Sequence, residues 1–165
     1  MERRDFNIIA KGISNWNMYR NATIMVTGAT GRLGRFILET LVDADLKYNL
    51  NLRVLGLARN HEKAVEVFGD LLEFPNVSFL YQDVNTAVAY DGKVDYIFHT
   101  AGPAAPLDFK TSSVNVLWSH VNGTHNVMEF AVKHETKKVF YISTVEIYGT
   151  WESDALIKEE DMGPL

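Results

Sequence analysis

The chain has 165 residues, of which 47% are hydrophobic and 22% are charged, and its formal net charge is −5. Such a composition is typical of a soluble globular protein with one main domain, because disordered chains are less hydrophobic and more highly charged. The acidic balance argues against nucleic acid and anionic membranes as partners. The absence of cysteine excludes disulfides and thiolate metal sites, and it agrees with a cytoplasmic location.

The histidines do not form a recognisable metal-binding motif. They are His61, His99, His120, His125 and His134. None stands in an HExxH pattern, so we expect packed or solvated histidines and no metal site. No apolar run approaches the roughly 18 residues of a membrane span, and the opening "MERRDFNIIAKG" carries charges where a signal peptide needs an apolar stretch. We therefore expect neither a membrane segment nor export by that route.

The first twenty residues predict a helical arm that precedes the main domain. Four apolar residues there have spacings of three and four, namely Phe6, Ile9, Ile13 and Trp16. This spacing is typical of an amphipathic helix that packs on a neighbouring surface. We therefore expect an N-terminal helical arm over residues 1–20 and one domain over residues 21–165.

From Thr23 onward, short apolar runs alternate with longer helical patterns. The runs predict strands at 23–27, 52–58, 77–81, 96–100 and 138–143. The patterns between them predict helices at 32–44, 61–72 and 111–134. Strands that read as continuous apolar runs and are separated by helices are typical of a parallel sheet buried on both faces. We expect a doubly wound α/β fold of the Rossmann type, with helices on both faces of the sheet.

The last of these helices contains a glycine among apolar residues of near-helical spacing. The apolar residues are Val114, Leu117, Val121, Met128 and Val132. Gly123 interrupts them at a cost of roughly 1 kcal/mol relative to alanine. A glycine at this place suggests that another segment approaches the helix closely.

Three glycines stand directly between the first strand and the first helix, in "TIMVTGATGRLGRFILETLV". A dinucleotide pyrophosphate needs a turn without Cβ atoms, so that N–H groups can reach it, and a helix start whose partial positive charge faces the anion. We assign Gly28 and Gly31 to this approach and Gly34 to helix packing. The alternative is a tight turn that binds nothing. The candidate NAD or NADP site takes from this turn Gly28, Thr30, Gly31, Arg32, Leu33 and Gly34.

The glycine spacing is GxxGxxG, and in this form the sequence resembles the extended short-chain dehydrogenase/reductase family. The resemblance runs from about Thr23 to the C-terminus. It depends on "TGATGRLG", "QDV", "HTAGPAAP", and "NGTHNVMEFA" followed by "STVEIYG". It is closest to the branch of UDP-glucuronate decarboxylase and dTDP-glucose 4,6-dehydratase. The family works on nucleotide sugars, which the resemblance implies as the substrate class of the full-length protein.

The resemblance implies further cofactor contacts. Asp83 and Val84 match positions that contact adenine, and Thr100, Ala101 and Gly102 match positions along the pyrophosphate and the nicotinamide ribose. By the same match His99 needs no catalytic role. Asn122 matches an asparagine that supports the active site in this family, although a backbone carbonyl could equally satisfy it.

The choice between NAD and NADP is left open by "GLARN" at the end of the second strand. Ala58 stands where many NAD-using relatives carry an aspartate for the adenosine ribose. Arg59 could stack on adenine, pair with a 2′-phosphate or remain a solvated loop residue.

The resemblance also implies a catalytic edge after the fifth strand. Thr144, four residues before Tyr148, matches the hydroxyl that hydrogen-bonds the reacting sugar oxygen. Glu146 matches an acid of the decarboxylases and dehydratases, whereas Val145 stands where the dehydratases carry an aspartate. We therefore expect Thr144 and Glu146 to act on a 4-keto sugar intermediate. The alternative for Glu146 is a solvated carboxylate at the end of the strand.

The tyrosine and lysine that complete catalysis in this family form a YxxxK motif, and none of the seven tyrosines here is followed by lysine at that spacing. We expect the chain to be the cofactor-binding fragment of a longer protein, cut before its substrate-binding part and inactive alone, with a homodimer as a candidate assembly. The alternative is a non-catalytic NAD(P)-sensing or protein-interaction module.

Overall fold

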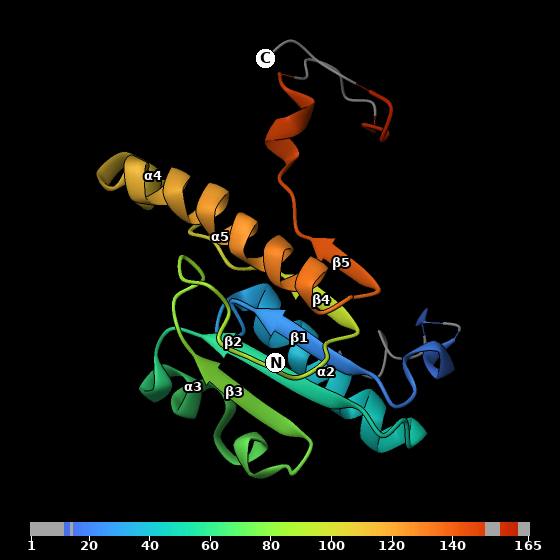
Figure 1. Cartoon of the computed structure of the whole chain (residues 1–165). Helices are drawn as coiled ribbons and strands as arrows, with labels where there is room; N and C mark the ends of the chain where they lie inside the picture. Colours follow the sequence, from blue (N-terminus) through green and yellow to red (C-terminus); the bar gives the residue numbers. More distant parts are fainter. Residues whose placement is uncertain (1–11, 14, 151–155, 162–165) are drawn as a thin grey trace.

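Five apolar segments form one parallel sheet in the computed structural model, which describes residues 12–13, 15–150 and 156–161. Its strands are β1 (Thr23–Thr27), β2 (Arg53–Ala58), β3 (Val77–Tyr81), β4 (Tyr96–His99) and β5 (Lys138–Tyr141). Their order across the sheet is β3-β2-β1-β4-β5, and every neighbouring pair is parallel (Figure 1). The order reverses direction at β1, as in a doubly wound fold. The predicted fold class is confirmed.

Helices cover the sheet on both faces. The α-helices are α2 (Arg32–Tyr48), α3 (His61–Phe68), α4 (Pro106–Thr111) and α5 (Ser113–Lys133). The shorter 3₁₀ helices are η1 (Trp16–Tyr19), η2 (Gly69–Glu73) and η3 (Val145–Tyr148). Because successive strand residues point to opposite faces of the sheet, each strand contributes side chains to two separate hydrophobic cores.

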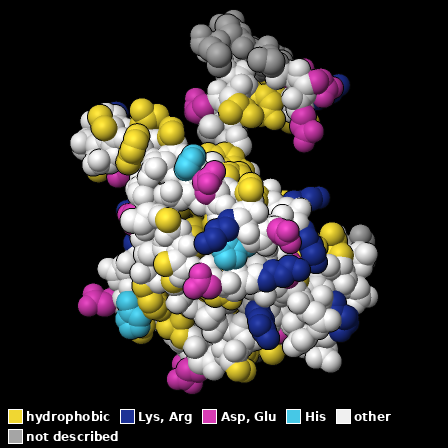
Figure 2. Space-filling view, viewed as in Figure 1, with side chains coloured by type: hydrophobic (Ala, Val, Ile, Leu, Met, Phe, Trp, Pro, Cys, Tyr) yellow, Lys and Arg dark blue, Asp and Glu magenta, His cyan; other side chains and the backbone are white. Residues whose placement is uncertain are grey.

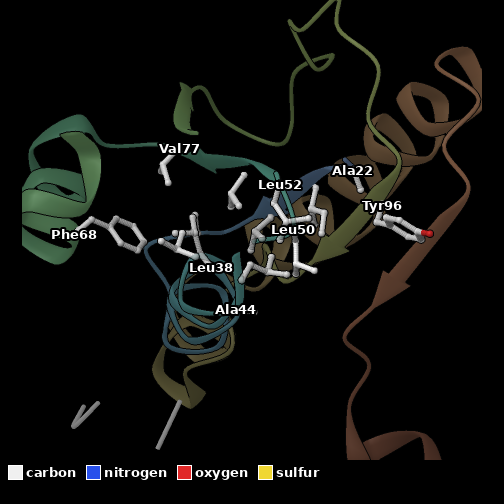
Figure 3. Close-up of a cluster of buried hydrophobic side chains, with 14 of the residues drawn as sticks. Ala22, Leu38, Ala44, Leu50, Leu52, Phe68, Val77 and Tyr96 are labelled. Carbon is white, nitrogen blue, oxygen red and sulfur yellow. The ribbon is translucent and has the colours of Figure 1, made fainter. Parts of the chain in front are cut away.

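One core lies between the sheet and the two helices α2 and α3 (Figure 3). Ile24 and Val26 of β1 point into it and are fully buried. They pack with Leu38 of α2 and Phe68 of α3. The alternate strand residue Met25 points the other way, into a second core that contains Val127, Phe130 and Ala131 of α5. The continuous apolar strands of the sequence are therefore explained by burial on both faces.

Several element ends differ from the predicted ones. Helix α2 continues to Tyr48 and ends at Asn49, whose left-handed φ of 50° is a conformation that asparagine tolerates. Helix α3 ends at Phe68 because Gly69 has a φ of 47° and breaks the helix, so η2 replaces its predicted last turn. Strand β5 ends at Tyr141, two residues early. Helix α4 was not predicted, and Pro106 begins it at a position that favours proline.

Helix α5 buries a different face from the apolar one noted in the sequence. Val114, Leu117 and Val121 are 76%, 64% and 57% exposed, and the buried face carries residues such as Val116 and Val127. Hydrophobic side chains also gather at the surface over α4 (Figure 2), where Leu107 and Phe109 are exposed. Apolar residues therefore occupy both faces of α5, and their spacing alone could not identify the buried one.

The close approach predicted at Gly123 is present. A Cβ atom at this position would lie 2.8 Å from Cγ1 of Val84, so the helix contacts the loop that follows β3. This contact brings α5 against the edge of the sheet where the strands end.

The described end of the arm packs on the domain. Trp16 of η1 is buried in the first core, and its ring stacks on Tyr48 with centroids 6.2 Å apart. The predicted helical positions Phe6 and Ile9 lie outside the described residues, so the arm itself stays a prediction. The helices of the described residues include no candidate for a membrane span.

Candidate functional site

A cavity of about 480 Å³ opens at the edge of the sheet where strands β1 to β4 end. This is the edge at which open α/β sheets bind ligands. Nine of the residues predicted for the cofactor line it, namely Gly28, Thr30, Gly31, Arg59, Asp83, Val84, Thr100, Ala101 and Gly102. They come from four separate loops, so the fold brings together residues up to 74 positions apart in the chain. The remaining predicted ones, Arg32, Leu33, Gly34 and Asn122, do not line it.

The turn between β1 and α2 is built on close backbone contacts. Gly28 has a φ of 65°, and a Cβ atom on it would lie 2.8 Å from the Cα atom of Ala101. A Cβ atom on Gly34 would overlap the carbonyl oxygen of Gly28 and lie 2.8 Å from Oγ1 of Thr100. Gly31 is less restricted, since its nearest contact would be the same carbonyl at 3.1 Å. Gly34 is therefore the place where the helix packs closest on the turn.

The start of α2 is open to an anion. Its N-cap residue is Gly31, no side chain caps the helix, and no acidic residue stands in its first turn. The first N–H groups of a helix have no partner within the helix and carry partial positive charge. Arg32 and Leu33 would thus contribute through their N–H groups, because their side chains are exposed and lie outside the cavity wall.

A hydrogen-bond network fixes the loop after β4 against β1. The hydroxyl of Thr27 accepts from the N–H groups of Thr100 and Ala101, at 3.2 and 3.3 Å. Both of its lone pairs are then occupied, so it donates to Nδ1 of His99 at 2.7 Å. The Thr100 hydroxyl in turn donates to the carbonyl of Thr27 at 2.7 Å. The two backbones that border the cavity are therefore held together.

His99 is a neutral member of this network. Burial, and then the neighbouring His120, lower its pKa to about 4. With Nδ1 accepting from Thr27, the proton resides on Nε2, which donates to Oγ1 of Thr124 at 3.2 Å. This positioning role could not be predicted from the sequence, because it requires strands β1 and β4 to be neighbours.

The loop after β3 is held by two asparagines of α5. Asn122 donates from Nδ2 to the carbonyl of Asn85 at 2.7 Å, and Asn126 donates to the carbonyl of Val84 at 2.9 Å. A backbone carbonyl therefore satisfies the side chain of Asn122, as the alternative to an active-site role supposed. The supporting role of Asn122 in the active site stays a prediction. Asn126 was missed, although its spacing of four from Asn122 places both on one helix face.

Further residues of the cavity wall were not assigned from the sequence. Asn60 and Lys63, after β2, line it beside Arg59. The wall contributed by α4, α5 and the loop before them contains Pro103, Asp108, Ser112, Asn115, Val116 and Ser119. Lys63, in the first turn of the helix after β2, could have been found from the sequence. The wall from α4 and α5 could not, because it depends on tertiary packing.

The predicted catalytic residues lie apart from the cavity. Thr144 and Glu146 follow β5 and are exposed, and neither lines the cavity wall. The Thr144 hydroxyl accepts from the N–H of Glu146 at 3.3 Å and so caps η3. Figure 1 shows η3 standing away from the sheet. The roles of both residues in catalysis stay predictions. Within the described part of the chain, no group of three His, Asp or Glu side chains could hold a metal ion.

The sequence of residues 24–165 matches the model of the NAD-dependent epimerase/dehydratase family. The chain belongs to this family. The resemblance drawn from its motifs is thereby confirmed at the level of the family.

Individual relatives agree with this. A UDP-glucose 4-epimerase of Rickettsia canadensis is 27% identical over 130 residues, which cover 77% of this chain and 38% of that protein. A solved dTDP-glucose 4,6-dehydratase, DesIV of Streptomyces venezuelae with NAD bound, is 23% identical with a TM-score of 0.69, over 86% of this chain and 45% of its own. The yeast methylglyoxal/isovaleraldehyde reductase Gre2 with NADPH is 26% identical with a TM-score of 0.61, over 76% of this chain and 38% of its own.

These relatives bear on the cofactor and on the extent of the chain. The expectation of NAD or NADP is confirmed for the family by its description and by the cofactors bound in two of its solved relatives. The chain spans less than half the length of the proteins that it matches. The narrower likeness to the UDP-glucuronate decarboxylase branch stays a prediction.

Proposed function

We propose that this chain is the NAD(P)-binding part of a nucleotide-sugar epimerase, dehydratase or decarboxylase that works through a 4-keto sugar intermediate. One observation carries the proposal: an uncapped helix start and a glycine turn border a cavity at the reversal point of a doubly wound sheet. The family of the chain and the names of its relatives support the substrate class.

The residues present fit a dinucleotide. Gly28 and Gly34 leave no room for a Cβ atom, so the turn stays close to the helix start, and Gly31 leaves the cap without a side chain. The N–H groups of this turn would hold the pyrophosphate. The bound cofactor supplies hydride exchange at C4 of the sugar, which activates the neighbouring C5 position and can be reversed later.

The chain's own contribution to chemistry would come from the segment after β5. In the family pattern Thr144 hydrogen-bonds the sugar oxygen during the oxidation at C4, and Glu146 moves a proton or assists bond cleavage at C5. Both side chains are exposed, so a bound sugar could reach them without displacing core residues. The network of Thr27, His99 and Thr100 would keep the loop after β4 in position, and β4 is the sheet neighbour of β5.

These 165 residues alone would not turn over a sugar nucleotide. They contain no YxxxK motif, and the loss of a positioned general base typically costs about 10²- to 10⁴-fold. The defect should be larger still, because most sugar contacts would also be missing.

The test incubates these residues, and separately a longer chain of the same gene, with NAD or NADP and UDP-glucuronate or UDP-glucose. Reduced nicotinamide is followed by absorbance and the products by chromatography. We expect turnover only with the longer chain, and there Glu146→Gln should still reduce the cofactor while Thr144→Ala slows that first step. Sustained turnover by the 165 residues, or a normal overall rate of the Glu146 variant, would contradict these roles.

A second candidate is a non-catalytic NAD(P)-sensing or protein-interaction module. Two observations favour it: the catalytic candidates lie outside the cavity, and α5 exposes an apolar face. Cofactor binding without turnover by any longer product of the gene would support it. The predicted homodimer also stays a proposal, which sedimentation of monomers alone would contradict. The predicted cytoplasmic location stays a proposal as well.

A further inference from the structure

The wall of the cavity beside β2 carries positive charge and no carboxylate on its own strand. Ala58 ends the strand and is only 2% exposed, yet it lines the cavity. NAD-binding folds of this class place an acid near here to accept the hydrogen bonds of the ribose hydroxyls. In this chain Arg59, Asn60 and Lys63 follow instead, and all three line the same wall.

Of the two cations, only Arg59 has an ion pair with a described residue, and that pair is long. Nη1 of Arg59 lies 3.9 Å from Oδ2 of Asp83, which is longer than the 2.7–2.9 Å of a charge-assisted hydrogen bond. The other carboxylate oxygen of Asp83 is already engaged by the N–H of Asn85 at 2.8 Å. Lys63 forms no ion pair with any residue that the structure describes. The second acid of the cavity, Asp108, comes from α4 on another wall.

The charge on this wall comes from side chains and not from a helix start. Asn60 accepts the N–H of Lys63 at 2.9 Å and thereby caps α3. The start of α2, in contrast, has no capping side chain. The cavity thus offers two different anion sites: backbone N–H groups at the turn after β1, and two cationic side chains after β2. A dinucleotide with two separate phosphate groups would occupy both.

We propose that Arg59 and Lys63 bind the 2′-phosphate of the adenosine ribose, so that this protein prefers NADP to NAD. The inference rests on the proposed function only in that the cavity takes a dinucleotide. A guanidinium can bind a phosphate through two parallel hydrogen bonds, and the ammonium adds a compact second charge. The small side chain of Ala58 leaves room for the phosphate and brings no charge to repel it.

The experiment measures dissociation constants of NADP, NAD, 2′,5′-ADP and 5′-AMP by isothermal titration calorimetry. The unchanged protein should bind NADP and 2′,5′-ADP at least about tenfold more tightly than NAD and 5′-AMP. Arg59→Ala and Lys63→Ala should each weaken NADP by about tenfold while NAD changes by less than about twofold. Ala58→Asp should reverse the preference, because its carboxylate repels the phosphate and accepts the ribose hydroxyls.

Arg53→Ala is the matched control, since it removes a cation from the opposite end of β2 and should leave all four constants unchanged. Circular dichroism checks the folding of Ala58→Asp, and if it fails to fold, the two exposed positions decide the question. Tighter binding of NAD than of NADP, or equal losses of both in the Arg59 and Lys63 variants, would overturn the inference alone. Binding of neither dinucleotide would overturn the proposed function together with it.

Discussion

His99 makes the stability of this protein depend on pH in a defined window. Its ring is 1% exposed and hydrogen-bonded on both nitrogens, and its pKa is lowered to about 4 from an ordinary 6.5, first by burial and then by His120. The unfolded chain therefore binds a proton between these values that the folded chain does not. This contribution to stability is complete above pH 6.5 and is lost as the pH falls toward 4.

We expect the free energy of unfolding to drop by about 3 kcal/mol across this window, as measured by urea denaturation at pH 7 and pH 4.5. His99→Gln should remove most of this dependence, whereas His125→Gln at an exposed position of α5 controls for the loss of a histidine. Asp95 acts in a lower window: burial raises its pKa, but the N–H of Thr23 and the charge of Lys137 lower it below 3.8 overall. A pH dependence that persists unchanged in His99→Gln would refute the assignment.

At the scale of elements, the packing of α2 on the turn after β1 depends on Gly34. A Cβ atom there would overlap the carbonyl oxygen of Gly28 and press on Thr100, and a backbone oxygen cannot move aside without opening the turn. We expect Gly34→Ala to lower the free energy of unfolding by about 2 kcal/mol or more, even though alanine favours helices. Gly31→Ala is the control, expected to cost less than about 1 kcal/mol because its Cβ has only one contact, at 3.1 Å. Equal stability of the two variants in thermal or urea unfolding would contradict this account.

The strands and the first helices could be predicted because their signals are local. Apolar runs such as that of β1 are continuous, and the glycine turn begins α2 directly after it. The ends of elements could be predicted less well, since the left-handed Asn49 and the positive φ of Gly69 are backbone choices that several residue types allow. The buried face of α5 was not predictable, because apolar side chains surround this helix and only contact with the sheet selects among them.

At the scale of the whole molecule, the site could be predicted only in part. The glycine turn and the loops after β3 and β4 carry motifs, and the structure brings them to one cavity. The hydrogen bond from Thr27 to His99 joins residues 72 positions apart. It forms only because β1 pairs with β4, and no motif in the sequence indicates this pairing. The wall from α4 and α5 was missed for the same reason. Thr144 and Glu146 were named from a resemblance, and their distance from the cavity leaves those roles to experiment.

The central claim is that the cavity at the carboxyl edge of the sheet holds a nicotinamide dinucleotide on the glycine turn. Gly31 is the residue that tests it most directly, because it lines the cavity and occupies the N-cap position of α2, while its φ of −74° suits other residues. Gly31→Val should therefore fold, yet place two methyl groups where the pyrophosphate would lie.

Calorimetric titration of NAD and NADP into the unchanged protein and into Gly31→Val is the measurement that decides. We predict binding of at least one dinucleotide to the unchanged protein and a loss of about 100-fold or more in a variant whose circular dichroism is normal. Unchanged dinucleotide affinity in the folded variant would contradict the account.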